Sequence, residues 1–141
     1  FKNPFPNKQA AAAANGGKAP PDLSLIVKAR AHHEDYIYAL LTGYGDAPAG
    51  HELSPGSNYN KYFPGHAIAM AQPLYADGVT YTDGTKATIE QQAHDVTTFL
   101  AWASEPKLEE RRRVGLMVML FLVFFAGIMY AAKRRLWSEV H

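Results

Sequence analysis

Cysteine is missing from all 141 residues of the chain, and its absence excludes several classes of site. Without a thiol the chain forms no disulfide, no thiolate metal site and no catalytic cysteine, and it offers no C-x-x-C-H segment for covalent haem attachment. The chain also has no large excess of positive or negative charge, since its formal net charge is +1. Its basic residues cluster beside one apolar segment. We therefore expect no nucleic-acid partner, which would require a basic stripe with interleaved aromatic residues.

Patterns of catalytic residues are also scarce. Among the six histidines no pair has the H-E-x-x-H spacing of a helical zinc site, and Ser24 and Ser54 lack a G-x-S-x-G context. His32 and His33 are adjacent and would point in different directions on a helix, which favours a solvated pair. The sequence therefore predicts a chain without a catalytic site of its own.

A single long apolar run stands out among what is present. Residues 114–132, VGLMVMLFLVFFAGIMYAA, contain no charge, and at 1.5 Å per residue such a helix is about 28 Å long, close to the thickness of a membrane's hydrocarbon core. Basic triplets at residues 111–113 and 133–135 flank the run, and Tyr130 and Trp137 suit a headgroup belt. We predict a transmembrane anchor over residues 111–136, in contact with membrane lipid, and a short tail at 137–141. The alternative is a helix buried on all sides, for which so small a chain leaves little surrounding protein.

Residues 1–110 form the predicted working domain, in which short helices are joined by long loops rich in proline and glycine. The run AAAAN at residues 11–15 predicts a short helix that the following GG ends. PPDLSLIVKAR at residues 20–30 predicts a helix introduced by Pro20 and Pro21. HEDYIYALLTG at residues 33–43 predicts another, with an apolar face and with Gly43 as its stop signal. The predicted fold class is therefore mainly α with long loops.

Two further elements follow the long loop of residues 43–75. ADGVTYTDGT at residues 76–85 has two Asp-Gly turns around a β-prone run, which predicts a small hairpin. TIEQQAHDVTTFLAWASEP at residues 88–106 predicts a helix with a capping box at Thr88 and Gln91 and an end at Pro106. Its predicted apolar stripe consists of Ile89, Ala93, Val96 and Leu100.

Met70 lies within the long loop, apart from the other three methionines, which belong to the apolar run. A methionine in a loop is more often a gap-filling core residue than a ligand. Here small neighbours leave room for a large flat group near the backbone, and apolar neighbours can line a wall; a thioether on a haem iron needs that setting, although composition alone does not select haem. The small neighbours are Gly65, Ala67, Ala69 and Ala71, and the apolar ones are Phe63, Ile68 and Leu74.

Four segments, followed by the single C-terminal span, together carry a family resemblance. They are NGGKAPPDLSLIVKARAHHEDYIYALLTGY at 15–44, YFPGHAIAMAQPLY at 62–75, DGTKAT at 83–88 and DVTTFLAWASEP at 95–106. In this combination the chain resembles, over essentially its whole length, the C-terminal portion of the cytochrome c1 family, the haem-bearing subunits of cytochrome bc1 complexes. The resemblance implies the C-terminal part of a cytochrome c-type haem domain plus one C-terminal transmembrane helix.

The same resemblance implies roles for individual residues. Met70 would be the axial ligand of a haem c iron, and so the metal ligand of this chain, with His66 as the alternative. Arg30 would reach a haem propionate with Tyr36 close by, which suits a permanently charged planar donor. The residues implied to line the pocket are Asn15, Pro20, Pro21, Ile26, Leu40, Leu41, Phe63 and Ile68.

The resemblance also implies a part that this sequence does not contain. In the family a C-x-x-C-H segment attaches the haem covalently and its His is the proximal ligand, so we expect that segment upstream of Phe1. Either the chain is a fragment of a longer subunit, or the subunit is made as two polypeptides that assemble. A homologue that has lost its haem is a third interpretation, which the intact Met70 motif disfavours.

The implied function is electron transfer in a ubiquinol:cytochrome c oxidoreductase of a respiratory or photosynthetic chain. Electrons would pass from the Rieske iron–sulfur protein through haem c to cytochrome c, and the anchor would lie beside cytochrome b in a dimeric complex. The haem domain would face the periplasm from a bacterial inner membrane or, alternatively, the intermembrane space of mitochondria. Two other hypotheses stay open: a haem-free, single-span structural subunit of a membrane complex, and a cofactor enzyme with its own substrate site.

Overall fold

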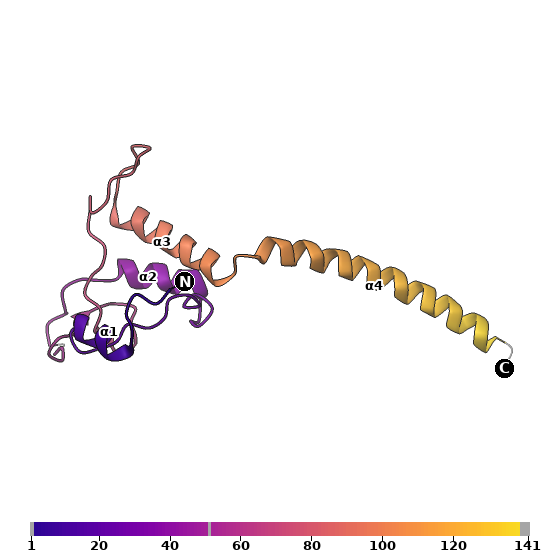
Figure 1. Cartoon of the computed structure of the whole chain (residues 1–141), viewed down its shortest axis with the longest axis horizontal. Helices are drawn as coiled ribbons and strands as arrows, with labels where there is room; N and C mark the ends of the chain where they lie inside the picture. The colour runs from indigo at the N-terminus through magenta and orange to yellow at the C-terminus, as the bar shows by residue number, and fades with distance from the viewer. Residues whose placement is uncertain (1, 51, 139–141) are drawn as a thin grey trace. The chain divides into compact units, whose positions relative to one another are not determined.

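The structure, a computed structural model, describes residues 2–50 and 52–138 and divides into two compact units, Phe1–Ser104 and Glu105–His141. Helix is the main regular secondary structure of both units, and long loops join the helices of the first, so the predicted fold, mainly α with long loops, is confirmed (Figure 1). The elements of the first unit are α1 (Lys8–Ala14), α2 (His33–Thr42), β1 (Asn58–Tyr59), the 3₁₀ helix η1 (Pro64–His66), β2 (Ala67–Ile68) and α3 (Ile89–Ser104). The second unit contains α4 (Leu108–Trp137).

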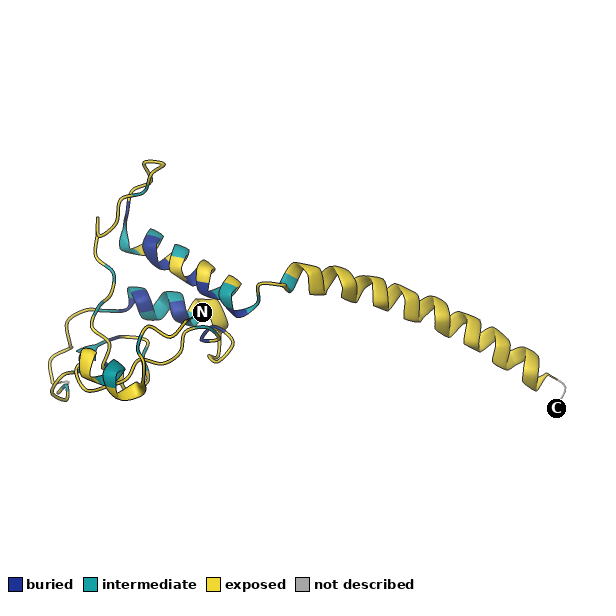
Figure 2. Cartoon of the chain, viewed as in Figure 1, coloured by how far each residue is buried: buried dark blue, intermediate teal, exposed yellow. Residues whose placement is uncertain are grey.

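The core of the first unit lies between α2 and α3, whose buried sides Figure 2 marks in dark blue. Ile37 and Leu41, four residues apart on α2, pack in one cluster with Ala93 and Leu100 of α3. This spacing places both α2 side chains on one face of the helix, as the sequence pattern predicts. Ile26 and Val27, from the segment before α2, complete the cluster. The core therefore depends on few large side chains.

The predicted start of α3 is confirmed in part. The main-chain N–H of Gln91 donates to Thr88 Oγ1 at 3.2 Å, which satisfies one of the N–H groups that a helix start leaves open. The Gln91 side chain does not return to Thr88 as a full capping box requires, because it donates to Asp95 Oδ1 at 3.0 Å. The Thr88 half of the predicted capping box therefore forms, and the Gln91 half is replaced by the side-chain hydrogen bond to Asp95 on the same helix.

The predicted apolar stripe of α3 is shifted in the structure. Ala93 and Leu100 are buried as expected, but Val96 is 39% exposed and Ile89 is only half-buried. The buried face continues instead through Thr97 and Ser104, residues that hydrophobicity alone does not select. The predicted face is therefore rotated about the helix axis from the buried one, which includes polar residues that a pattern of apolar side chains cannot identify.

The helix predicted over residues 20–30 does not form, and this prediction was wrong. Ser24 N–H donates to Asp22 Oδ1 at 2.8 Å, and a series of turns follows until α2 begins at His33. His32, the N-cap of α2, has a φ angle of 62°, and His33, the first residue of α2, has one of 46°, so no right-handed helix runs on from residue 30 into α2. The His33 ring Nδ1 lies 3.2 Å from the carbonyl oxygen of Val27, so this histidine closes the turn rather than facing water alone.

The predicted hairpin over residues 76–85 is also absent, since that segment contains no strand. Two bonds close the segment at its base: Asp77 N–H donates to the Ala87 carbonyl at 2.8 Å, and Gly78 N–H donates to the Tyr75 carbonyl at 3.1 Å. Farther out, the Tyr81 hydroxyl donates to Asp95 Oδ2 at 2.5 Å. Side-chain bonds to α3 replace the cross-strand ladder, because a run of four residues is too short to support one by itself.

The Tyr81–Asp95 bond predicts a pH window for this segment. The Tyr81 and Gln91 side chains, as donors, lower the pKa of Asp95 below its ordinary 3.8, while the Asp95 carboxylate raises the pKa of Tyr81 above its ordinary 10.0. A lowered carboxyl pKa gives stability that is present above 3.8 and lost as pH falls through the folded value; a raised phenol pKa gives stability that is lost as pH rises past 10.0. We expect the protection of the amides of residues 77–85 against exchange, relative to an unfolded chain at the same pH, to be greatest between these limits, and Tyr81→Phe to remove the high-pH limb. An unchanged profile in that variant would contradict the bond.

The second unit is built on α4, a helix of 30 residues and so about 45 Å long. Its most apolar window has a mean hydropathy of 2.5, and it is the one helix in the described residues that is long and apolar enough to cross a membrane. The predicted span, residues 114–132, lies inside it. Pro106 separates α3 from α4 as predicted, and Arg111 of the first turn of α4 pairs with Glu105. The predicted domain boundary at residue 110 falls within α4.

Candidate functional site

Met70 lies two residues after the end of β2, and the structure holds its main chain while leaving its side chain accessible. Its side chain is 41% exposed, so it does not fill a gap in the core of this chain. Its carbonyl oxygen accepts two hydrogen bonds of 3.2 Å, from the Tyr44 hydroxyl and from Asn58 Nδ2. A thioether on a fixed backbone that faces outward is available as a ligand.

Asn60 fixes the loop that carries Met70 and is fully buried, with 0% exposure. Its Nδ2 donates to the Leu40 carbonyl at 2.8 Å, near the end of α2. Its Oδ1 accepts from the main-chain N–H of Tyr62 at 3.0 Å and of Phe63 at 3.2 Å. One side chain therefore satisfies the helix end and shapes the turn that leads to η1.

Gly43 allows the close approach of that turn to α2. A Cβ built on Gly43 would lie 2.6 Å from a ring carbon of Tyr62 and 2.8 Å from the Ala39 carbonyl oxygen. Any larger residue would push Tyr62 away, and the Lys61 N–H donates to the Gly43 carbonyl at 2.9 Å at the same place. Gly43, which the sequence predicts as a helix stop, therefore also leaves the space in which the turn before the Met70 loop packs against α2.

Tyr44, whose hydroxyl bonds to the Met70 carbonyl, has a clearly shifted pKa. Burial raises the pKa of its hydroxyl to about 12. The hydroxyl therefore remains protonated, and able to donate to Met70, throughout the physiological range. Tyr44 and Asn58 also line an open depression of about 390 Å³, to which none of the predicted site residues contributes. Its lining includes Tyr44, Asp46, Leu53, Asn58, Tyr59 and Gln72.

The small residues predicted to leave space around Met70 do so in part. A Cβ built on Gly65 would meet nothing within 4 Å, and Gly65 has a φ of +76°. Ala69 and Ala71 are exposed on either side of Met70, whereas Ile68 is buried and Phe63 half-buried. The ring of His66, the alternative ligand, stacks against Tyr59 with 5.9 Å between centroids. Met70 and His66 are both exposed, so the stacking of the His66 ring, rather than exposure, distinguishes the two candidate ligands.

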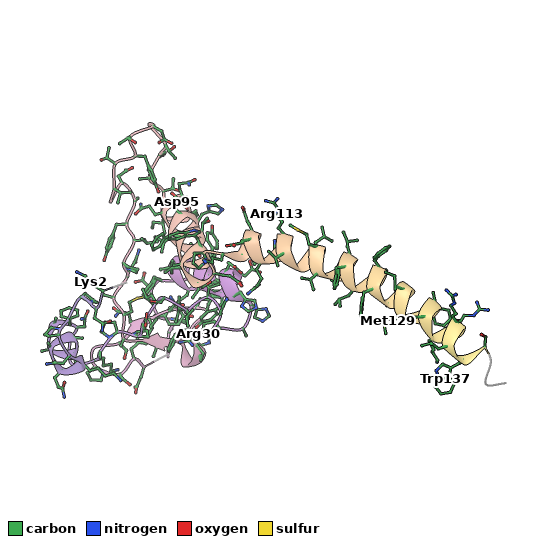
Figure 3. All side chains as sticks on the ribbon, turned by 45° about the vertical axis from the view of Figure 1, so that its right-hand side comes forward. Lys2, Arg30, Asp95, Arg113, Met129 and Trp137 are labelled. Atoms are coloured by element: carbon green, nitrogen blue, oxygen red, sulfur yellow. The ribbon has the colours of Figure 1, made fainter. Side chains whose placement is uncertain are left out.

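Arg30 lies on the turn segment before α2 and is exposed (Figure 3). Its Nη1 donates to the neighbouring Ala29 carbonyl at 3.2 Å, so the guanidinium retains further donors. Tyr36 is half-buried against the core cluster. An exposed planar cation of this kind suits an anionic partner such as a propionate.

The remaining predicted lining residues divide into two groups. Ile26, Leu41 and Ile68 are buried and Leu40 is half-buried, so they support the site from within. Asn15, Pro20 and Pro21 are exposed, and Asn15 Nδ2 donates to the Ala11 carbonyl at 2.7 Å at the end of α1. The predicted lining residues of this chain are thus partly buried support and partly exposed surface, and they do not together enclose a pocket.

These residues fit a haem group in one respect that the structure tests. Met70 presents an accessible soft ligand beside small residues, and no group of three or more His, Cys, Asp or Glu side chains that could hold a metal ion occurs in residues 2–50 and 52–138. Sequence reasoning missed Tyr44, Asn58 and Asn60. The asparagine before an aromatic pair was the available signal, since asparagine side chains often bond main-chain groups two residues on.

Comparisons with known proteins place the chain in a family. The model of the Cytochrome C1 family matches residues 1–140. A cytochrome b/c1 of Bradyrhizobium diazoefficiens is 49% identical over 160 aligned residues, with 100% of this chain and 23% of the relative covered. A mitochondrial cytochrome c1 haem protein of Kluyveromyces lactis is 55% identical, and the alignment covers 97% of this chain and 47% of the relative. A mitochondrial cytochrome b-c1 complex catalytic subunit of Candida albicans is 54% identical, and the alignment covers 97% of this chain and 48% of the relative. The chain spans less than half the length of each of these relatives. It belongs to the cytochrome C1 family.

Proposed function

We propose that this chain is the C-terminal, membrane-anchored part of the haem subunit of a ubiquinol:cytochrome c oxidoreductase, the cytochrome bc1 complex. The family match over residues 1–140 carries the proposal, supported by relatives named cytochrome b/c1 and cytochrome b-c1 complex catalytic subunit. The exposed, backbone-anchored thioether of Met70 agrees with it. A haem-free structural subunit would have no use for that arrangement.

In this proposal Met70 is an axial ligand of haem c, and Arg30 offsets the charge of a propionate with Tyr36 beside it. The haem, when bound, supplies reversible one-electron chemistry. The chain's own residues supply an uncharged ligand, a cation for the propionate and apolar surface. The attachment cysteines and the proximal histidine must come from another part of the subunit, because this sequence has no cysteine.

The partners follow from the same proposal. The Rieske iron–sulfur protein would be the electron donor and cytochrome c the acceptor, within a dimeric complex. Helix α4 would lie in membrane lipid beside cytochrome b, since its length and hydropathy suit a single span. The haem domain would face the periplasm of a bacterium or the intermembrane space of a mitochondrion; the relatives include a bacterial and a mitochondrial protein, which agrees with either membrane.

Peptide mapping of the purified complex tests the haem assignment. We expect that, after denaturation and proteolysis, covalently bound haem is found on a C-x-x-C-H peptide that copurifies with this chain. Peptides of this chain serve as the internal control and should carry no covalent haem, because they contain no cysteine. If no such haem peptide is present, the electron-transfer proposal fails and the haem-free structural subunit replaces it.

A further inference from the structure

The Met70 carbonyl oxygen is the meeting point of two hydrogen bonds from separate segments. The Tyr44 hydroxyl comes from the chain just after α2, and Asn58 Nδ2 comes from β1; each is 3.2 Å away. A carbonyl oxygen has two lone pairs, so this acceptor is fully used. The Met70 main chain is therefore held from two sides, whereas its side chain is 41% exposed.

Both donors are themselves fixed to the rest of the first unit. Tyr44 forms an antiparallel bridge with Asn60, the fully buried residue that bonds to the end of α2. Asn58 pairs with Ile68 in the β1–β2 register, two residues before Met70. The position of the Met70 main chain is thus set by α2 and by the two short strands, and not by the loop alone.

This anchoring matters because a thioether is a neutral and weak ligand. No charge attracts it to an iron, and its bond depends on being held at the correct place. Rotation about the main chain at Met70 would move the sulfur away, and two bonds to the carbonyl oppose that rotation. We propose that Tyr44 and Asn58 are positioning residues that hold the Met70 sulfur in place through the Met70 carbonyl. The inference rests on the proposed ligand role of Met70.

The test compares Tyr44→Phe, Asn58→Leu and the double variant in the intact complex. The readouts are the absorption of the thioether–ferric iron bond and the affinity of the ferric haem for added cyanide, which competes with Met70. Each lost hydrogen bond should increase cyanide affinity about fivefold, and the double variant about 25-fold, from the net contribution of one such bond. Tyr75→Phe is the matched control, because Tyr75 is 61% exposed and its hydroxyl bonds to nothing in the part of the chain that the structure describes.

The outcomes separate this inference from the proposed function. If the unaltered complex lacks the thioether–iron absorption, the ligand role of Met70 fails. If that absorption is present and the double variant binds cyanide like the unaltered complex, only the positioning role fails. A loss of thermal stability with unchanged cyanide affinity counts against the inference too, because it would show a structural role alone. Tyr44→Phe removes a single oxygen atom, so its cyanide affinity tests the positioning role even if the Asn58 variant does not assemble.

Discussion

Replacing Met70 by leucine is expected to lower the haem reduction potential by on the order of 0.1 V or more, within the ~0.8 V range that axial ligands control. Leucine preserves the apolar volume but removes the sulfur, which as a neutral thioether ligand raises the potential. The exposed position of Met70 means that the substitution should disturb the fold little. A redox titration of the purified complex measures the shift, and the rate of cytochrome c reduction should fall with it.

The matched control for this prediction is Met117→Leu in α4, the same chemical change at a position in the apolar run. It should leave the potential where it is. An unchanged potential in Met70→Leu would instead mean that another side chain ligates the iron. His66 would then be the first residue to replace, although its ring stacks on Tyr59.

Replacing Asn60 by alanine is expected to destabilise the first unit by about 3 kcal/mol, because three hydrogen bonds of a fully buried side chain are lost together. The Leu40 carbonyl and two main-chain N–H groups would be left without their partner. For a unit of this size the loss corresponds to a fall of about 10 °C or more in the midpoint of thermal unfolding. Calorimetry of the purified complex, with transitions assigned by haem absorption, measures it.

Asn3→Ala is the control for that substitution, since Asn3 is exposed. Its unfolding midpoint should match that of the unaltered protein. The Asn60 variant should also bind cyanide more tightly, because the same asparagine bridges to Tyr44 and shapes the turn before Met70. A normal midpoint in Asn60→Ala would show that water replaces the side chain at this position and that the loop does not depend on it.

The helices that packing and capping both favour could be predicted from the sequence. The apolar face of residues 33–43 with Gly43 at its end, and the Thr88 cap before α3, are local patterns, and both lie where expected. The apolar run of α4 needed only its length and the absence of charge. These features depend on residues a few positions apart, which is the range at which sequence patterns are informative.

The failures have a common physical cause in contacts between distant residues. The helix expected over residues 20–30 gives way to turns, from which Ile26 and Val27 join the core cluster with Ala93 and Leu100 of α3. The expected hairpin yields to the bond from Tyr81 to Asp95, which lies 14 residues away. In the candidate site, the neighbours of Met70 marked it as a possible ligand and the family resemblance gave it the haem role, but Tyr44 and Asn58 could not be predicted, because they are 26 and 12 residues distant.

If Met70 ligates a haem as proposed, the two hydrogen bonds to its carbonyl oxygen would also affect the rate of electron transfer. Each transfer changes the charge on the iron, and the barrier includes the energy needed to rearrange the ligands for the new charge, the reorganisation energy. A ligand whose backbone is tied to Tyr44 and Asn58 can shift little between the two oxidation states. Fixed dipoles and ligands that need not move keep such barriers small. In the proposed site, the loop would therefore contribute to speed through its stiffness as well as to potential through its sulfur.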